Sequence, residues 1–146
     1  MRITQEADYA LRITYLLAKR GEKLDSISIS EATGVTERFT VKILRKLVGG
    51  GLIVSHKGVK GGYELALPPG EVSMRRVIET IDGKTEISRC LDCGYECTRM
   101  GDQKCDCAFH LIFDKINSEL TDKLDSVTLA SVLDEGTGID KILKKL

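Results

Sequence analysis

The run of patterns between residues 28 and 67 constrains the fold of this chain more than any other feature. The stretch SISE at 28–31 fits a capping box and predicts a short helix that ends near Gly34. Thr36 is then expected to cap a longer helix that continues to about Val48. We expect the inward face of this second helix to consist of Phe39, Ile43, Leu44 and Leu47.

A hairpin pattern follows this helix pair directly. Glycines at 49–51 end the helix, residues 52–54 form an apolar β run, and residues 63–67 alternate like a half-buried strand. The loop between them, 56–62, is rich in glycine and lysine. Any two helices of a small bundle can resemble a helix-turn-helix, but the hairpin completes the order of a winged helix. The predicted fold is therefore mainly α with a small β-hairpin wing: a winged helix-turn-helix.

The charge distribution favours DNA as a partner, although the formal net charge of the chain is zero. Residues 36–62 contain six basic residues and one acid, whereas residues 79–146 contain nine basic residues and fourteen acids. Such a basic patch is often only a solvated surface, but on a winged helix it suits a phosphate backbone. Arg38 is the expected reader of guanine. The candidate DNA-binding residues are Ser28, Thr36, Arg38, Thr40, Lys42, Lys46, His56, Lys57 and Lys60.

Helices are also predicted on either side of this region. One covers residues 5–20, between a capping Thr4 and Gly21. Others cover 73–82 and 127–133, and the amphipathic tail after them is expected to be loose. The inward face of the first helix is expected to consist of Ala7, Ala10, Leu11, Thr14 and Leu17.

A long helix from about Ala108 to Leu124 carries an apolar stripe that predicts a partner helix. The stripe could pack inside one chain, but the remaining residues are too few to cover it, which favours a homodimer. Two recognition helices related by a two-fold axis would read palindromic double-stranded DNA about one turn apart. The stripe consists of Phe109, Phe113, Ile116, Leu120, Leu124 and Val127.

The chain is expected to divide into three parts. These are a DNA-binding domain at 1–83, a cysteine-rich loop at 84–107, and a dimerisation helix with a C-terminal tail at 108–146. No run of about 18 apolar residues is present, so no membrane partner is expected. The first residues lack the apolar block of a signal peptide, which indicates a cytoplasmic protein whose thiols stay reduced.

All five cysteines fall within residues 90–107, and an odd number cannot form a complete set of disulfides. Their spacing allows three interpretations. Four of them could bind one zinc ion, leaving Cys97 unused. A subset could instead hold an iron–sulfur cluster, or pairs of thiols could form an oxidation switch. The zinc ligands would be Cys90, Cys93, Cys105 and Cys107.

An enzyme is not expected. The chain has two histidines and lacks an HExxH motif, a serine nucleophile elbow and a dinucleotide-binding glycine motif. The glycines at 58–62 do not form a P-loop, because the GxxxxGK[ST] order and a following helix are missing.

Several stretches together resemble one known family. They are the opening MRITQEADYALR, the helix pair SISEATGVTERFTVKILRKLVGGGLI, the wing SHKGVKGGYELA, the segment RCLDCGYEC…KCDCAFH, and the ending DSVTLASVL. Over residues 1–133 the chain resembles the IscR/NsrR-type transcription regulators, the Rrf-two family. The resemblance implies a dimeric winged-helix repressor in which three loop cysteines hold a 2Fe–2S or 4Fe–4S cluster near the dimer interface. Such a regulator would sense nitric oxide, redox state, iron or iron–sulfur status.

The resemblance also implies which cysteines bind the cluster. Cys90, Cys97 and Cys107 match the three thiolates of the family. Cys93 and Cys105 are extra, and the gap between Cys97 and Cys107 is longer than is usual in the family. The two additional cysteines could complete an all-cysteine site or replace one of the three.

The fourth ligand varies within the family. His110 matches the histidine that some members use, and Asp8 matches an acid that others donate from the partner subunit. Cys107 and His110 are three residues apart on a predicted helix, so both could face one ion. Asp106 is expected to cap that helix, whose positive end would favour an anionic cluster.

Overall fold

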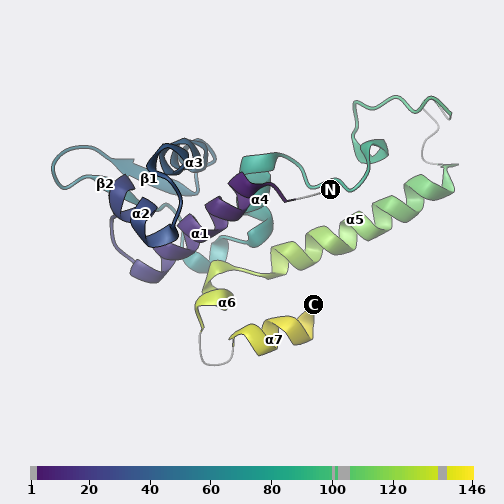
Figure 1. Cartoon of the computed structure of the whole chain (residues 1–146). Helices are drawn as coiled ribbons and strands as arrows, with labels where there is room; N and C mark the ends of the chain where they lie inside the picture. The colour runs from purple at the N-terminus through teal and green to yellow at the C-terminus, as the bar shows by residue number, and fades with distance from the viewer. Residues whose placement is uncertain (1–2, 100, 102–105, 135–137) are drawn as a thin grey trace.

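The structure is a computed structural model that describes residues 3–99, 101, 106–134 and 138–146. Helices dominate, and the strands of the described residues form one antiparallel hairpin, which confirms the predicted mainly α winged-helix fold (Figure 1). In chain order the elements are α1 (Gln5–Arg20), α2 (Ser26–Thr33), α3 (Glu37–Gly49), β1 (Ile53–His56), β2 (Gly62–Leu65), the 3₁₀ turn η1 (Pro69–Glu71), α4 (Met74–Asp82), the 3₁₀ turn η2 (Arg89–Leu91), α5 (Ala108–Ser126), α6 (Leu129–Leu133) and α7 (Gly138–Lys145).

Helix α1 begins and ends where the sequence predicts. The Thr4 hydroxyl accepts a hydrogen bond from Ala7 N at 3.2 Å, and Gly21 ends the helix with a φ of 63°. The predicted inward face needs one correction, because Ile13 is fully buried while Leu11 is only partly buried. The buried residues of α1 are Ala7, Ala10, Ile13, Thr14 and Leu17.

The predicted capping box at Ser28 is wrong, because α2 begins earlier and Asp25 caps it. Asp25 Oδ1 accepts hydrogen bonds from Ile27 N at 3.0 Å and from Ser28 N at 2.9 Å. Its Oδ2 also accepts from the Ser28 hydroxyl at 2.8 Å. One carboxylate therefore satisfies two free amides at the start of the helix. The end of α2 at Gly34, where φ is 69°, agrees with the prediction.

Helix α3 buries Ile43, Leu44 and Leu47 as predicted, but the prediction that Phe39 belongs to the inward face is wrong. The Phe39 side chain is 44% exposed, and Thr40 is completely buried in its place. Positions three, four and seven residues after Thr40 are the buried ones, so the helical period selects Thr40 for the inward face.

The hairpin follows α3 with Ile53 opposite Leu65 and His56 opposite Gly62. Tyr63 extends the pairing to the loop before α2, because its amide donates to Leu24 O at 2.8 Å. Gly62 has a φ of 147°, and a Cβ there would lie 2.8 Å from Leu24 O. A glycine is therefore required where the returning strand passes this loop.

The core forms around α1, which contacts α2, α3, α4, α6 and β2. The C-terminal segment returns to this core after α5: Met74 N donates to Val127 O at 2.8 Å and Leu129 N to Val72 O at 2.9 Å. Leu129 is buried in the same apolar cluster as Ala10. The residues just after the long helix thus complete the packing of the N-terminal helices.

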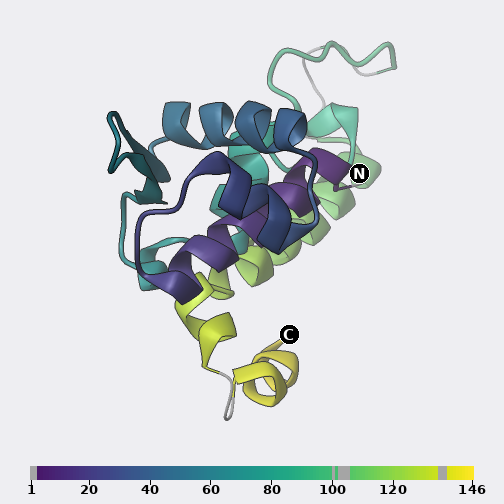
Figure 2. The same ribbon diagram turned by 60° about the vertical axis from the view of Figure 1, so that its left-hand side comes forward.

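Helix α5 extends away from this body, and the cysteine loop runs out on the same side (Figure 1). Figure 2 shows the loop projecting beyond the packed helices. A further helix, α7, forms in the tail that was expected to be loose. Across the described residues, no helix is both long and apolar enough to span a membrane. The exposed large apolar residues of α5 are Phe109, Leu111, Ile112 and Ile116.

Candidate nucleic-acid interface and cysteine loop

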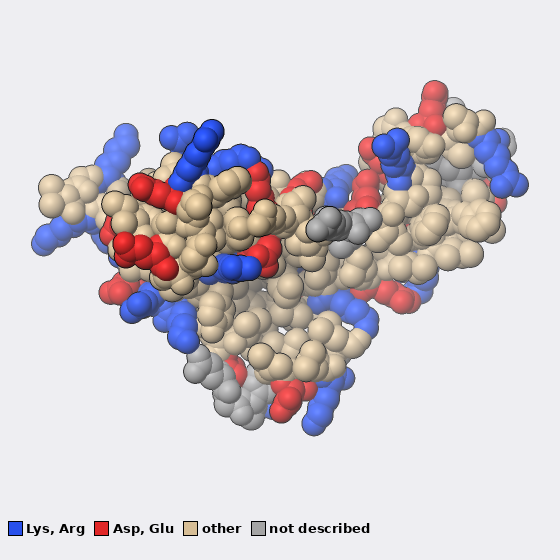
Figure 3. Space-filling model, in the orientation of Figure 1, with Lys and Arg blue, Asp and Glu red and all other residues tan. Residues whose placement is uncertain are grey.

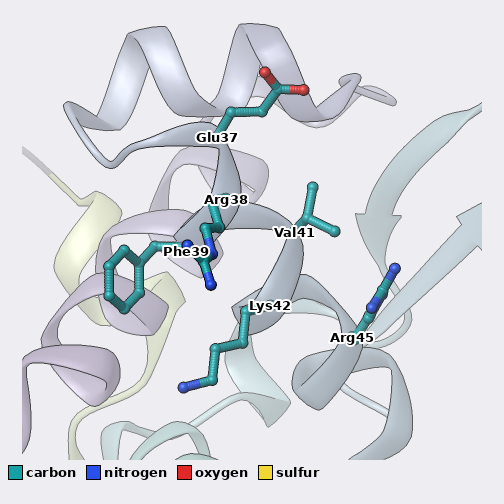
Figure 4. Close-up of a pocket in the computed structure, with 6 residues that line it drawn as sticks. All are labelled: Glu37, Arg38, Phe39, Val41, Lys42 and Arg45. Atoms are coloured by element: carbon teal, nitrogen blue, oxygen red, sulfur yellow. The ribbon is translucent and has the colours of Figure 1, made fainter.

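The outer face of α3 is open to solvent. Figure 4 shows Phe39 directed toward α1, while Val41 and Arg45 lie on the side of the hairpin. Arg38 and Lys42 are exposed between them. These side chains form a surface hollow lined by Glu37, Arg38, Phe39, Val41, Lys42 and Arg45.

Basic side chains project from the end of the molecule that carries α3 and the hairpin (Figure 3). Lys57 and Lys60 are exposed on the loop between β1 and β2, on either side of a fully exposed Val59. Arg38 and Arg45 are exposed on α3. The helix and the wing therefore present cations that suit phosphate oxygens.

Two of the predicted DNA-binding lysines are already paired within the chain. Lys42 Nζ forms an ion pair with Glu6 Oε1, and Lys46 Nζ lies 2.6 Å from Glu6 Oε2. The hydrogen bonds from Lys42 and Lys46 hold the pKa of Glu6 below its usual value. Glu6 is therefore ionised at neutral pH and partly neutralises this part of α3.

The other predicted DNA-binding residues differ in how exposed they are and in whether they are already hydrogen-bonded within the chain. The prediction that Thr40 contacts DNA is wrong, because its side chain is fully buried on the inward face of α3. Ser28 is partly buried and its hydroxyl is donated to Asp25, whereas Thr36 is exposed and makes no capping bond. His56 Nε2 lies 2.5 Å from Glu64 Oε1 across the hairpin, so this side chain is engaged within the wing.

The cysteine loop is attached to two helices near its beginning. Thr85 N donates to Glu79 Oε1 of α4 at 3.1 Å, and Ile87 N donates to Asn117 Oδ1 of α5 at 3.0 Å. The turn η2, which contains Cys90, also contacts α5. Cys90 is therefore held close to the helix that begins at the other end of the loop.

The cysteines differ in exposure. Cys90, Cys97 and Cys107 are partly buried, Cys93 is exposed, and Cys105 lies outside the described residues. No group of three or more histidine, cysteine or acidic side chains that could hold a metal ion is present in the described part of the chain. The structure therefore does not bring Cys90, Cys97 and Cys107 together.

Cys107 and His110 lie at the start of α5. The residue at the N-cap is Cys107, without a side-chain capping bond, so the prediction that Asp106 caps this helix is wrong. His110 Nδ1 is buried, and no described residue offers it a hydrogen-bond partner. Asp8 lies on α1, where its carboxylate pairs with Arg12 at 2.7 Å. An orphaned imidazole nitrogen one turn from a thiol is a suitable pair of metal donors.

A family model described as "Rrf2: Iron-dependent Transcriptional regulator" matches residues 3–135. The chain belongs to the Rrf2 family of transcriptional regulators. Members of this family are transcriptional regulators rather than enzymes. The Rrf2 match covers every element from α1 to α6.

Individual relatives support the assignment to the Rrf2 family. An rrf2-like HTH-type transcriptional regulator of Rhodobacter capsulatus is 30% identical over 97% of this chain and 99% of its own length. The HTH-type transcriptional regulator IscR of Pectobacterium carotovorum is 26% identical over 96% of this chain and 84% of its own. Protein aau3 of Rhizobium meliloti is 35% identical over 64% of this chain. That match spans only 62% of the length of aau3.

Solved structures share the Rrf2 fold. CymR of B. subtilis, described as a global cysteine regulator, has a TM-score of 0.73 at 21% identity and covers 92% of this chain and 98% of its own. IscR of T. potens has a TM-score of 0.70 at 22% identity, and the match covers 92% of this chain and 88% of the IscR chain. The oxidized form of Staphylococcus aureus CymR has a TM-score of 0.67 at 25% identity, covering 92% and 97%.

The sequence did not indicate the residues that attach α1 to α3 and the cysteine loop to α4 and α5. Glu6, Glu79 and Asn117 are polar residues on helices, and nothing in their local sequence distinguishes them from ordinary solvated side chains. Glu6 lies in the first turn of α1, where an acid is expected from the helix dipole alone. Its presence there therefore does not indicate a contact with α3. Their roles depend on which distant backbone or lysine they reach.

Proposed function

We propose that this Rrf2 regulator is a homodimeric repressor that binds palindromic DNA and is controlled by an iron–sulfur cluster on its cysteine loop. The observation that best supports the cluster is the pair formed by Cys107 and His110. The histidine Nδ1 is buried without a partner among the described residues, one turn after the N-terminal thiol. A metal would satisfy this nitrogen.

The DNA-binding part of the proposal is supported by the exposed cations. Arg38 lies in the first turn of α3, from which a recognition helix contacts base edges in the major groove. Lys57 and Lys60 extend from the wing, where lysines contact phosphates or enter a minor groove. The helix would read the sequence and the wing would add affinity.

The dimer is supported by the apolar face of α5. Phe109, Ile112 and Ile116 are 64%, 53% and 49% exposed, and their spacing of three and four residues places them on one face. A second α5 would cover this face in a symmetric pair. The same pairing would set the distance between the two recognition helices.

The donor set fits the proposed cluster in chemistry. Thiolates and imidazole are ligands that iron–sulfur centres use, and Cys90, Cys97, Cys107 and His110 supply them. Because these donors are not gathered in the described residues, cluster binding would require Cys90 and Cys97 to approach Cys107 and His110. Asp8 of the partner subunit would be an alternative fourth ligand. When bound, the cluster would supply redox chemistry and iron that nitric oxide or oxygen can attack.

A thiol switch without a cluster is the second candidate. Cys90, Cys93 and Cys107 carry free thiols. The similarity to the oxidized form of Staphylococcus aureus CymR favours a response to oxidation on this fold. A zinc-bound loop is the related alternative, with zinc acting as a structural staple.

Metal analysis separates these candidates. The chain is purified without air, and iron, acid-labile sulfide and zinc are measured together with the visible absorption spectrum. The proposal expects a coloured protein that contains both iron and sulfide. Stoichiometric zinc would contradict the cluster and support the staple. Loss of DNA binding with peroxide in metal-free protein, restored by a thiol reductant, would support the thiol switch.

A further inference from the structure

A carboxylate of the same chain holds two lysines of the recognition helix. Glu6 stands in the first turn of α1, and Lys42 and Lys46 stand one turn apart on α3. Each lysine bonds a different oxygen of Glu6, and the Lys46 distance is 2.6 Å. The Glu6 side chain is 23% exposed, whereas Lys42 and Lys46 are 54% and 38% exposed.

We propose that Glu6 competes with DNA phosphate for Lys42 and Lys46, and thereby limits how strongly the regulator binds DNA of unrelated sequence. This inference rests on the proposed role of α3 in binding DNA. Glu6 then sets the sequence-independent part of the DNA affinity and never touches a base.

The charges of the three groups support this competition. Two lysines on one helix face would normally offer two positive charges to the phosphate backbone. One ionised carboxylate between them leaves a net charge of one, and each lysine must exchange the carboxylate for a phosphate. Both effects lower the part of the binding energy that does not depend on base sequence.

Arg38, the expected base-reading residue of α3, is separate from the pairing of Glu6 with Lys42 and Lys46. The ion pairs found for Glu6 in the described residues are those with Lys42 and Lys46, and Arg38 is not among its partners. A specificity ratio is a difference between two affinities. Because the phosphate term is common to operator and other DNA, weakening it lowers both affinities, while the discrimination expected from Arg38 is kept.

The position of Glu6 is fixed by its neighbours. Thr4 donates its amide to Asp82 at 3.1 Å and its hydroxyl to the same carboxylate at 2.5 Å. Thr4 also caps α1 through Ala7 N. The first turn of α1 is thus attached to the end of α4, and Glu6 is presented to α3 without further ordering.

The test uses Glu6→Gln, which removes the charge and keeps the size of the side chain. Binding of the full-length protein to a random-sequence duplex is measured by fluorescence anisotropy over a range of salt concentrations. The variant is expected to bind roughly 3- to 30-fold tighter at low salt, with a salt slope steeper by up to about 2, because each phosphate contact contributes about 0.9. Binding to the operator is expected to gain by a similar factor, because the phosphate term is common to both DNAs.

Glu22→Gln is the matched control, because Glu22 is an exposed acid beyond the other end of α1, about 24 Å away along a helix of 16 residues. It makes the same change in net charge. Equal salt slopes for Glu6→Gln and Glu22→Gln, with both variants folded by circular dichroism, would overturn the inference.

A second measurement places Glu6→Gln in a Lys42→Gln, Lys46→Gln background. Competition predicts no further gain in affinity there, and a gain of the same size would overturn it in favour of simple long-range repulsion. If the wild-type protein binds neither operator nor random DNA, the proposed function fails first. If the wild type binds and the slopes do not differ, only the role of Glu6 fails.

Discussion

Ile87 N donates a hydrogen bond to Asn117 Oδ1 at 3.0 Å, so the beginning of the cysteine loop is attached to the middle of α5. Asn117 lies seven residues after His110, which places both side chains on the same face of the helix. The neighbouring bond from Thr85 N to Glu79 attaches the loop to α4 as well. The loop is therefore attached both to α4 in the winged-helix body and to α5, which carries the exposed apolar face.

Asn117→Ala is expected to release this attachment and to weaken metal retention. The Ile87 amide loses its partner, and the turn that carries Cys90 is no longer held against α5. Iron or zinc remaining after timed exposure to a chelator measures the effect, and at least a tenfold faster loss is expected, comparable to the removal of other outer-sphere supports. Ser118→Ala, on an adjacent exposed position, is the control. Equal loss rates for the two variants would show that the contact does not support the metal site.

Arg38→Gln is expected to change base preference. A bidentate arginine–guanine pair contributes about 1–3 kcal/mol of discrimination, and Arg38 is exposed in the first turn of α3. Selection of binding sites from a randomised operator measures the preference at each base pair. Thr40→Val serves as the comparison, because this side chain is fully buried on the inward face of α3 and its replacement should leave the preference unchanged. A shift with Thr40→Val and none with Arg38→Gln would reverse the assignment of the two residues.

Lys57→Gln is expected to weaken binding on operator and random DNA alike, and to lower the salt slope by about 1. Lys57 is exposed on the wing loop. Lys115→Gln on α5 is the control, since Lys115 pairs with Glu119 away from the wing. The measurement is anisotropy at several salt concentrations. An altered base preference at constant slope would mean that Lys57 reads sequence instead.

The sequence predicted most of the fold because the relevant signals are local. Thr4 and Gly21 bound α1, Gly34 ends α2, and the glycines before Tyr63 mark the hairpin. The main error in α3 arose where two local criteria disagreed. Phe39 is the more hydrophobic residue, whereas Thr40 has the correct helical phase, and the phase decided which one is buried.

The candidate site could be predicted only in part. Exposed cations such as Arg38 and Lys57 follow from the pattern, because a helix face or a loop tip determines their exposure. The pairing of Glu6 with Lys42 and Lys46 could not be predicted, since these lysines are 36 and 40 residues away in sequence. Asn117 is 30 residues from Ile87, and no local pattern indicates that contact.

Asp25→Ala is expected to lower stability at neutral pH more than in acid. Hydrogen bonds from the Ser28 amide, the Ser28 hydroxyl and the Ile27 amide hold the pKa of Asp25 below its ordinary value. A lowered folded-state pKa contributes stability above the unfolded pKa, and this stability is lost as the pH falls through the folded pKa. Thermal unfolding midpoints of wild type and variant should therefore differ at pH 7 and converge as the pH falls below the ordinary range of an aspartate pKa. A difference that stays constant with pH would mean that the charge of Asp25 has no role in the cap.

Gly50→Ala is expected to destabilise the contact between α3 and α4. A Cβ at Gly50 would lie 2.4 Å from Thr80 Cγ2, so the Thr80 side chain or one of the two helices must shift, which typically costs about 1–3 kcal/mol. Urea unfolding measures the change in the free energy of unfolding. Gly49→Ala is the matched control, because a Cβ there meets nothing within 4 Å and alanine suits a helix better than glycine.

The contact can be tested further by relieving it. Thr80→Ser removes Cγ2 while keeping the hydroxyl that donates to Arg76 O at 2.7 Å. The double variant Gly50→Ala, Thr80→Ser should therefore recover most of the stability that Gly50→Ala loses. Because the two positions are in contact, their effects should be clearly non-additive in a double-mutant cycle. Additive losses would show that the cost at Gly50 arises from the backbone of the α3 terminus and not from packing against α4.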